Sequence, residues 1–228
     1  INVAKVREIL GPDAALDSWS LIFDPAIASK LSACGISVLE DPEDAFTSAL
    51  LWKGMDPSVS DAAALDAVKQ TFMEIRPYIR NFHSSQYITD LANGDICVAM
   101  GYSGDVFQAR DRAEEAKNGI EIAFIIPKQG ASLWVDVMAV PADAPHKANA
   151  MKFINYLMKP DVAAAISNYV SYATPNTAAL ALLDPELAAD KSIYPDAEVK
   201  ARLVDPPTFP ADVQRERVRL RTTIKTGK

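Results

Sequence analysis

The sequence predicts an α/β protein, and two observations support this class. Short apolar runs alternate with stretches of helical periodicity along most of the chain. Residues 96–126 form the clearest unit, with an apolar run at Ile96–Met100, a helical stretch from Asp105 to Lys117 and a second apolar run at Ile120–Ile126. A strand, a helix and a strand at this spacing indicate a parallel pair of strands. At 228 residues, the chain can form one large or two small domains.

The chain before this unit is expected to alternate helices with short strands. An amphipathic helix over Ile1–Leu10 stops at Gly11-Pro12. The turn Asn93-Gly94-Asp95 ends the last helix before the apolar run at residue 96. The other predicted helices here are Ser29–Cys34, Pro42–Leu51, Asp61–Glu74 and Ser84–Ala92, and the predicted strands are Ile36–Leu39 and Ile79–Phe82.

The run Leu133–Val140 is apolar at both alternating sets of positions, which predicts a strand buried on both faces. Asp136 lies in its middle and shares a face with Trp134. A buried carboxylate usually pairs, accepts hydrogen bonds or becomes protonated, because its isolated charge is costly. We therefore expect a partner for Asp136. The sequence leaves open whether this is an Arg, Lys or backbone group or a bound ligand.

The rest of the chain is predicted to be largely helical. Helices are expected over Lys147–Met158 and Asp161–Val170. A proline-rich region then runs from Pro185 to Pro210, and a basic helix lies near Val213–Ile224.

Composition excludes several classes of partner. The net charge of -7 argues against nucleic acid or an anionic membrane surface, and no apolar run approaches the roughly 18 residues that span a bilayer. The chain starts at Ile1 without a Met, which we interpret as a processed or excised product. Cys34 and Cys97 are the only cysteines, so one disulfide and two free thiols both stay open.

Enzyme motifs are incomplete. Gly101–Asp105 lies on a predicted strand-to-helix turn, where a hydrolase nucleophile would lie, but it lacks the second glycine of that motif. The two histidines, His83 and His146, are far apart in the sequence and near turns or element ends. No nucleotide-binding glycine motif and no metal-ligand spacing occurs, so we expect no enzyme activity, metal or cofactor.

Aromatic residues instead lie beside carboxylates at the ends of predicted elements. Aromatic faces and carboxylates both attract ammonium groups, so the set predicts a site for an organic amine. Each member also has a structural interpretation: Asp105 can be a helix N-cap, a first-turn Glu43 favours its helix, and the aromatic rings can be core. The set consists of Glu43, Tyr102, Asp105, Trp134, Asp136 and Tyr172.

Three stretches resemble the polyamine-binding periplasmic proteins, the putrescine and spermidine receptors of ABC transporters. They are "NFHSSQYITDLANGDICVAMGYSGDVFQA", "WVDVMAVPADAPHKANAMKFINYLMKPDVAAAISNYVSYATPN" and "SIYPDAEVKARL". The resemblance covers essentially the whole sequence and corresponds to the C-terminal two thirds of a family chain.

The resemblance implies a two-lobe α/β fold of the type II periplasmic binding proteins, which closes on ligand like a flytrap. The N-terminal part of the first lobe is expected to be absent from this chain. Residues 1–118 would form the core of the second lobe, 119–170 a return segment of the first lobe with a hinge strand, and 171–228 a crossing back with a C-terminal helix. The strand at Leu133–Val140 would then lose neighbours unless another chain or copy supplied them.

The resemblance also implies roles for individual residues. The six residues of the amine set fall on the family's ligand positions, with Asp105 and Asp136 as partners of amine nitrogens and Glu43 as partner of an amine further along. Cys34 and Cys97 match cysteines that form a disulfide in close relatives, which favours a bridge and a periplasmic location. Tyr102 departs from the Trp usual there, which puts one wall of the site in doubt.

These inferences predict a receptor that hands a polyamine to an ABC-type import permease. Trp134 stands where spermidine-preferring members tend to have Trp and putrescine-preferring ones Phe, so spermidine is predicted over putrescine. A sensor that presents the amine to a signalling partner would use the same fold, and the sequence leaves this alternative open.

Overall fold

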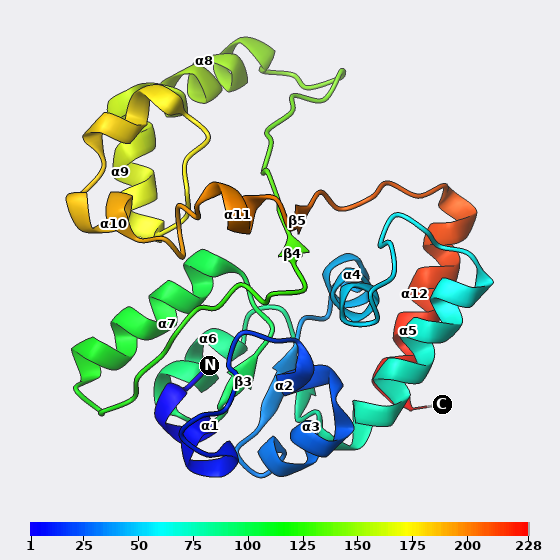
Figure 1. Ribbon diagram of the computed structural model, residues 1–228. Coiled ribbons are helices and arrows are strands. Elements are labelled where there is room, and N and C mark those ends of the chain that lie inside the picture. Colours follow the sequence, from blue (N-terminus) through cyan, green and yellow to red (C-terminus); the bar gives the residue numbers. More distant parts are fainter. Residues whose placement is uncertain (228) are drawn as a thin grey trace. The chain divides into compact units, whose positions relative to one another are not determined.

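The structure, a computed structural model, describes residues 1–227 and divides into two units (Figure 1). Unit 1 comprises Ile1–Leu133 together with residues 197–227, and unit 2 comprises Trp134–Asp196. The assignment of residues 1–118, 119–170 and 171–228 to lobes of the family fold stays a prediction.

Unit 1 is built on a parallel three-stranded sheet in the order β2-β1-β3. The central strand β1 (Ile36–Val38) is buried at all three positions, as expected for a strand covered on both faces. It pairs with β2 (Asn81–Phe82) through Ser37 and Val38, and with β3 (Val98–Ala99) through Ile36 and Ser37. The sequence predicted all three strands near these positions.

Helices surround this sheet, and four of them begin at a side-chain cap. Asn2, Asp24, Asp41 and Asp61 each accept a hydrogen bond from a backbone N–H of the first helical turn. The helices of unit 1 are α1 (Val3–Leu10), α2 (Ser20–Phe23), α3 (Pro25–Leu31), α4 (Pro42–Trp52), α5 (Ala62–Ile75), the 3₁₀ turn η1 (Arg76–Tyr78), α6 (Tyr87–Asn93), α7 (Ser103–Ala116), α11 (Ala197–Lys200) and α12 (Ala211–Thr226).

One apolar core holds these elements together. The ring of Phe72 lies edge-on to Phe23 with centroids 5.4 Å apart, and 6.2 Å from Phe46. These rings join α2, α4 and α5 in the core. The C-terminal helix α12 lies alongside α5 and adds Ile224 to the same core (Figure 1).

The predicted pairing of Ile96–Met100 with Ile120–Ile126 is wrong. Within residues 1–227, the second run forms only an isolated antiparallel bridge, between Asn2 and Ile122. Asn2 also donates its backbone N–H to Cys97 O at 2.8 Å, so the start of the chain lies between the two runs. The parallel partner of β3 is β1, which the local strand–helix–strand pattern could not indicate.

The predicted buried strand over Leu133–Val140 is also wrong. The short strand β4 (Ala131–Ser132) pairs in parallel with β5 (Leu203–Val204), and the last bond runs from Leu133 N–H to Val204 O at 2.8 Å. In the described part of the chain, no strand continues beyond this point, and Val137 is 85% exposed. A strand needs a neighbour to take its backbone N–H and C=O groups, and the described residues provide none here.

Unit 2 is helical, with a small core around Ala164, Ala179 and Leu183. Its longest helices lie where the sequence placed them, but α8 has no buried residue. The elements of unit 2 are α8 (Lys147–Leu157), α9 (Pro160–Val170), the 3₁₀ helix η2 (Thr177–Leu182) and α10 (Pro185–Ala189).

Cys34 and Cys97 form a disulfide with their Cα atoms 5.6 Å apart, which confirms the bridge. It connects the loop after α3 to the start of β3. Within residues 1–227, no helix combines the length and apolar character needed to cross a membrane.

Candidate functional site

The six predicted site residues divide equally between the units. Glu43, Tyr102 and Asp105 belong to unit 1, and Trp134, Asp136 and Tyr172 belong to unit 2.

Tyr102 and Asp105 follow the carboxyl end of β3, the edge at which open α/β sheets bind ligands. Asp105 is not the N-cap of α7. The helix begins at Ser103 with Tyr102 in the cap position, and Asp105 lies in the first turn. Its carboxylate therefore points into a side-chain network rather than satisfying the helix start.

Tyr87, on α6, organises this network. Its side chain is fully buried, and its hydroxyl donates to Asp105 Oδ2 at 2.7 Å. The same hydroxyl oxygen accepts the backbone N–H of Tyr102 at 3.0 Å. One buried phenol thus fixes both a carboxylate and the backbone of the adjacent aromatic residue.

Gly101 allows this arrangement because it leaves room for the phenol ring. A Cβ at position 101 would come within 2.4 Å of a Tyr87 ring carbon, closer than any real contact. Position 101 therefore needs a glycine so that the Tyr87 ring can pack directly against the backbone.

Asp44, in the first turn of α4, supplies a second carboxylate to the same cluster. The Tyr102 hydroxyl donates to Asp44 Oδ2 at 2.8 Å, and Asp44 is 5% exposed. The carboxylate from α4 therefore accepts from the Tyr102 phenol and the one from α7 from the Tyr87 phenol, so acid oxygens lie beside aromatic residues. Such a combination favours an organic cation.

Glu43, next to Asp44, contacts a different part of unit 1. Its Oε2 lies 3.0 Å from a guanidinium nitrogen of Arg217 on α12. Adjacent residues of a helix point about 100° apart, so two neighbouring acids at the start of α4 contact two different elements. The role of Glu43 in ligand binding stays a prediction.

In unit 2, the structure changes the environment predicted for Trp134 and Asp136. Asp136 was expected to be buried in a strand, but it is exposed and lies outside any strand. Trp134 is 46% exposed. The burial cost that demanded a partner for Asp136 therefore does not apply here, because water solvates the carboxylate. Their ligand roles stay predictions.

Tyr172 lies on a well-anchored loop after α9. Ser171, at the end of α9, adopts a left-handed backbone with φ of 57°, and the Ser167 hydroxyl donates to the carbonyl of Tyr172. Asn176 closes the loop by donating its side-chain amide to Met158 O at 2.8 Å. The half-buried Tyr172 side chain is thus held by a defined backbone.

Sequence reasoning missed Asp44, Tyr87 and Arg217. Tyr87 lies in a predicted helix and Asp44 directly follows a chosen residue, but neither carries a local signal of its contacts. Among the described residues, no group of three or more His, Cys, Asp or Glu side chains is arranged to hold a metal ion.

Known proteins share both the sequence and the fold. The chain is 47% identical over its whole length to the putrescine-binding periplasmic protein PotF of Escherichia coli K12, and 44% identical to the putrescine-binding periplasmic protein SpuD of Pseudomonas aeruginosa UCBPP-PA14. It spans 62% of the length of each relative. A solved structure from Listeria monocytogenes, described as a spermidine/putrescine ABC transporter, superposes with a TM-score of 0.83 at 26% identity, covering 97% of this chain and 65% of that one.

A protein-family profile also matches most of the chain. The profile of the family described as "Bacterial extracellular solute-binding protein" matches residues 2–195. The alternation of helices with a parallel sheet and the likeness to the solved structure agree with this match. The chain therefore belongs to the bacterial extracellular solute-binding proteins.

Proposed function

We propose that the chain is part of a periplasmic receptor that binds a polyamine and delivers it to the membrane permease of an ABC-type importer. The observation that carries the proposal is the cluster in unit 1, where the carboxylates of Asp44 and Asp105 accept hydrogen bonds from the phenols of Tyr102 and Tyr87. Carboxylates set among aromatic rings suit an ammonium group on an alkyl chain. The names of the two relatives support this assignment.

The remaining predicted residues complete the proposed site. Asp105 and Asp136 would each contact an ammonium group, while Tyr102, Trp134 and Tyr172 would line the methylene chain. A ligand that contacts two lobes of a receptor stabilises the closed state, because only that state makes both sets of contacts. The permease would then bind the closed, loaded form.

Two features bear on the choice of amine. The Trp at position 134 predicted a preference for spermidine over putrescine, whereas both relatives are named for putrescine. We propose a diamine of the putrescine class as the preferred ligand. Titration calorimetry of the complete protein with putrescine, spermidine, spermine and agmatine tests both the binding function and the preference for a diamine. Tightest binding of spermidine would contradict the preference. No detectable binding of any of the four amines would contradict the proposed function.

The proposal includes no chemistry on the ligand. Prolonged incubation with putrescine or spermidine should return the amine unchanged, as followed by mass spectrometry. Any protein-dependent product would contradict a receptor role.

A further inference from the structure

His83 holds the turn that connects β2 to α6. Its ring nitrogen Nδ1 accepts the backbone N–H of Ser85 and that of Gln86, both at 3.1 Å. Asparagine and aspartate usually make such turns, through a side-chain oxygen that accepts a backbone N–H a few residues further on. An imidazole in this place differs from an amide oxygen in one respect, because it can take up a proton.

The two hydrogen bonds define the state of the ring. A nitrogen that accepts hydrogen bonds carries no proton, so the turn requires a neutral imidazole with its proton on Nε2. Protonation at Nδ1 removes both bonds and places a positive charge beside the positive end of α6. Histidine is the side chain that usually changes its charge between pH 5 and 8, and His83 is exposed to water.

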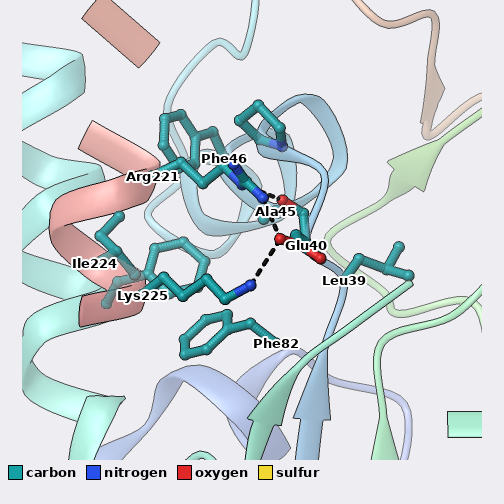
Figure 2. Close-up of a pocket in the computed structure, with 10 residues that line it drawn as sticks. Leu39, Glu40, Ala45, Phe46, Phe82, Arg221, Ile224 and Lys225 are labelled. Atoms are coloured by element: carbon teal, nitrogen blue, oxygen red, sulfur yellow. Dashed lines mark hydrogen bonds and ion pairs between the residues drawn. The ribbon is translucent and has the colours of Figure 1, made fainter. Parts of the chain in front are cut away.

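An acid, Glu40, lies beside this turn, and two basic side chains already pair with it. Glu40 donates its backbone N–H to Ser84 Oγ at 3.1 Å, and Lys225 and Arg221 of α12 contact its carboxylate (Figure 2). The pKa of Glu40 is lowered first by Lys225, then by Arg221, and the last contribution to this lower pKa comes from the charge of His83. Two cations thus match the single acid, so Glu40 gives a protonated ring little net stabilisation.

Other charged groups near the turn also have partners. Arg76 lies over the Phe82 ring, 5.6 Å from its centroid. Asp90, on α6, accepts a hydrogen bond from the Asn81 amide at 3.4 Å. Each therefore has a partner other than His83, and Arg76 adds a further cation to the end of β2.

The turn leads directly into Tyr87, the first residue of α6. The buried Tyr87 hydroxyl donates to Asp105 and accepts the backbone N–H of Tyr102. Helix α6 has only seven residues, and so short a helix depends on its ends and its packing because its own propensity cannot maintain it. A turn that opens therefore loosens the element that holds this phenol in place.

We propose that His83 is a proton-sensitive positioning residue: protonation of its ring opens the turn before α6 and loosens the contacts of Tyr87 with Asp105 and Tyr102. The inference goes beyond the proposed function, because it concerns the folded chain with or without a ligand. Mild acid then loosens this cluster locally, while the core of unit 1 stays folded.

The test is amide hydrogen exchange of the complete protein, followed residue by residue by NMR at pH 8 and at pH 5, the two ends of the usual histidine range. The decisive variant is His83→Asn, because its amide oxygen can hold the same turn but does not titrate. At pH 8 the two proteins should exchange alike. At pH 5 the unmodified protein should exchange about fivefold faster at Gln86 and at Tyr102, the size of one net hydrogen bond.

Comparison of the two proteins at the same pH cancels the intrinsic effect of pH on exchange. Equal exchange at pH 5 would overturn the inference. Faster exchange at Gln86 with unchanged exchange at Tyr102 would overturn the coupling to the cluster, since the Tyr102 N–H bonds to the Tyr87 hydroxyl.

Three controls separate a local proton effect from a general one. His83→Ala removes the acceptor, so it should exchange faster than the unmodified protein at pH 8 as well. His146, the other histidine, stands at the N-cap of α8, and among the described residues its ring makes no cap hydrogen bond. His146→Asn should therefore keep the acid response, and its loss in that variant would overturn the role of His83. Amides of Val68 and Phe72 in the core helix α5 should exchange alike in all variants, and a parallel rise there would show global unfolding instead of local opening.

Discussion

At the level of single residues, Asp105 carries most of the proposed recognition in unit 1. Its carboxylate accepts a hydrogen bond from buried Tyr87 and lies in the first turn of α7. Because its position is fixed before ligand arrives, little side-chain freedom is lost when an amine binds.

Asp105→Asn should weaken putrescine binding by about 1.5–3 kcal/mol, because an amide cannot form the charge-assisted bond to an ammonium group. Titration calorimetry of the complete protein measures this loss. Asp111→Asn, which changes a half-exposed acid on the same helix, is the matched control. Equal affinity in Asp105→Asn and Asp111→Asn would remove Asp105 from the site.

Tyr87→Phe should weaken putrescine binding by about 0.5–1.5 kcal/mol although Tyr87 need not contact ligand, because the variant loses the hydroxyl that orients Asp105 and the Tyr102 backbone. Tyr78→Phe, elsewhere in unit 1, removes a hydroxyl outside this network. Binding and thermal melting of both variants separate the effects. A loss of stability with unchanged affinity would make Tyr87 purely structural.

The site candidates that the sequence could indicate in unit 1 are those with a local context. Tyr102 and Asp105 could be placed from a strand, a glycine and a helix that follow one another in the chain. Asp44 and Tyr87 could not, because their roles depend on α4, α6 and α7 meeting in space. Two acids side by side at a helix start carry no signal of which one faces the cluster.

At the level of elements, ion pairs attach α12 to the segment before α4. Lys225 Nζ lies 2.7 Å from Glu40 Oε1, and Arg221 contacts the same oxygen (Figure 2). The hydrogen bond from Lys225, followed by the charges of Lys225 and Arg221, lowers the pKa of Glu40 below its ordinary value.

This shift predicts a specific acid sensitivity. A carboxyl group whose pKa is lower in the folded state stabilises the fold above its unfolded pKa of about 4.3, and the contribution disappears as the pH falls through the lower folded value. Glu40→Gln should therefore reduce the thermal midpoint at pH 6 but not at the acid end of a pH series. An equal reduction at every pH would contradict this linkage.

The disulfide should contribute to stability through the long loop it closes. The bonded residues are 63 positions apart, and a loop of that size corresponds to about 4 kcal/mol of restricted unfolded-state freedom. Cys34→Ala combined with Cys97→Ala should lower the free energy of unfolding in a urea titration by an amount of this order. A loss below about 1 kcal/mol would show that the disulfide contributes little to the stability of the fold.

Two strand predictions failed for one physical reason: a strand is defined by its neighbours. Ile120–Ile126 has strand composition, but within residues 1–227 its pairing is limited to one isolated antiparallel bridge with the first residues of the chain. Leu133–Val140 has the pattern of a strand buried on both faces, but the described residues offer its backbone no ladder beyond Val204. Apolar pattern predicts burial correctly only when the covering elements are present.

At the level of the whole molecule, the chain spans 62% of the length of its two named relatives. The exposed residues after Leu133 and helix α8, which has no buried residue, belong to unit 2, which contains residues 134–170 of the predicted first-lobe segment. We therefore place the proposed function in the complete protein and use it in every binding experiment. The α/β class and the family could be predicted from this part of the sequence alone, because their motifs are local.

The proposed receptor recognises the ammonium groups at both ends of an alkyl chain through its carboxylates. The most direct measurement compares putrescine, butylamine and 1,4-butanediol in titrations of the complete protein, since the three share a four-carbon chain and differ in charge. Putrescine should bind tightest, butylamine at least about tenfold more weakly, and the diol not at all. Equal binding of butylamine and putrescine, or measurable binding of the diol, would contradict the account.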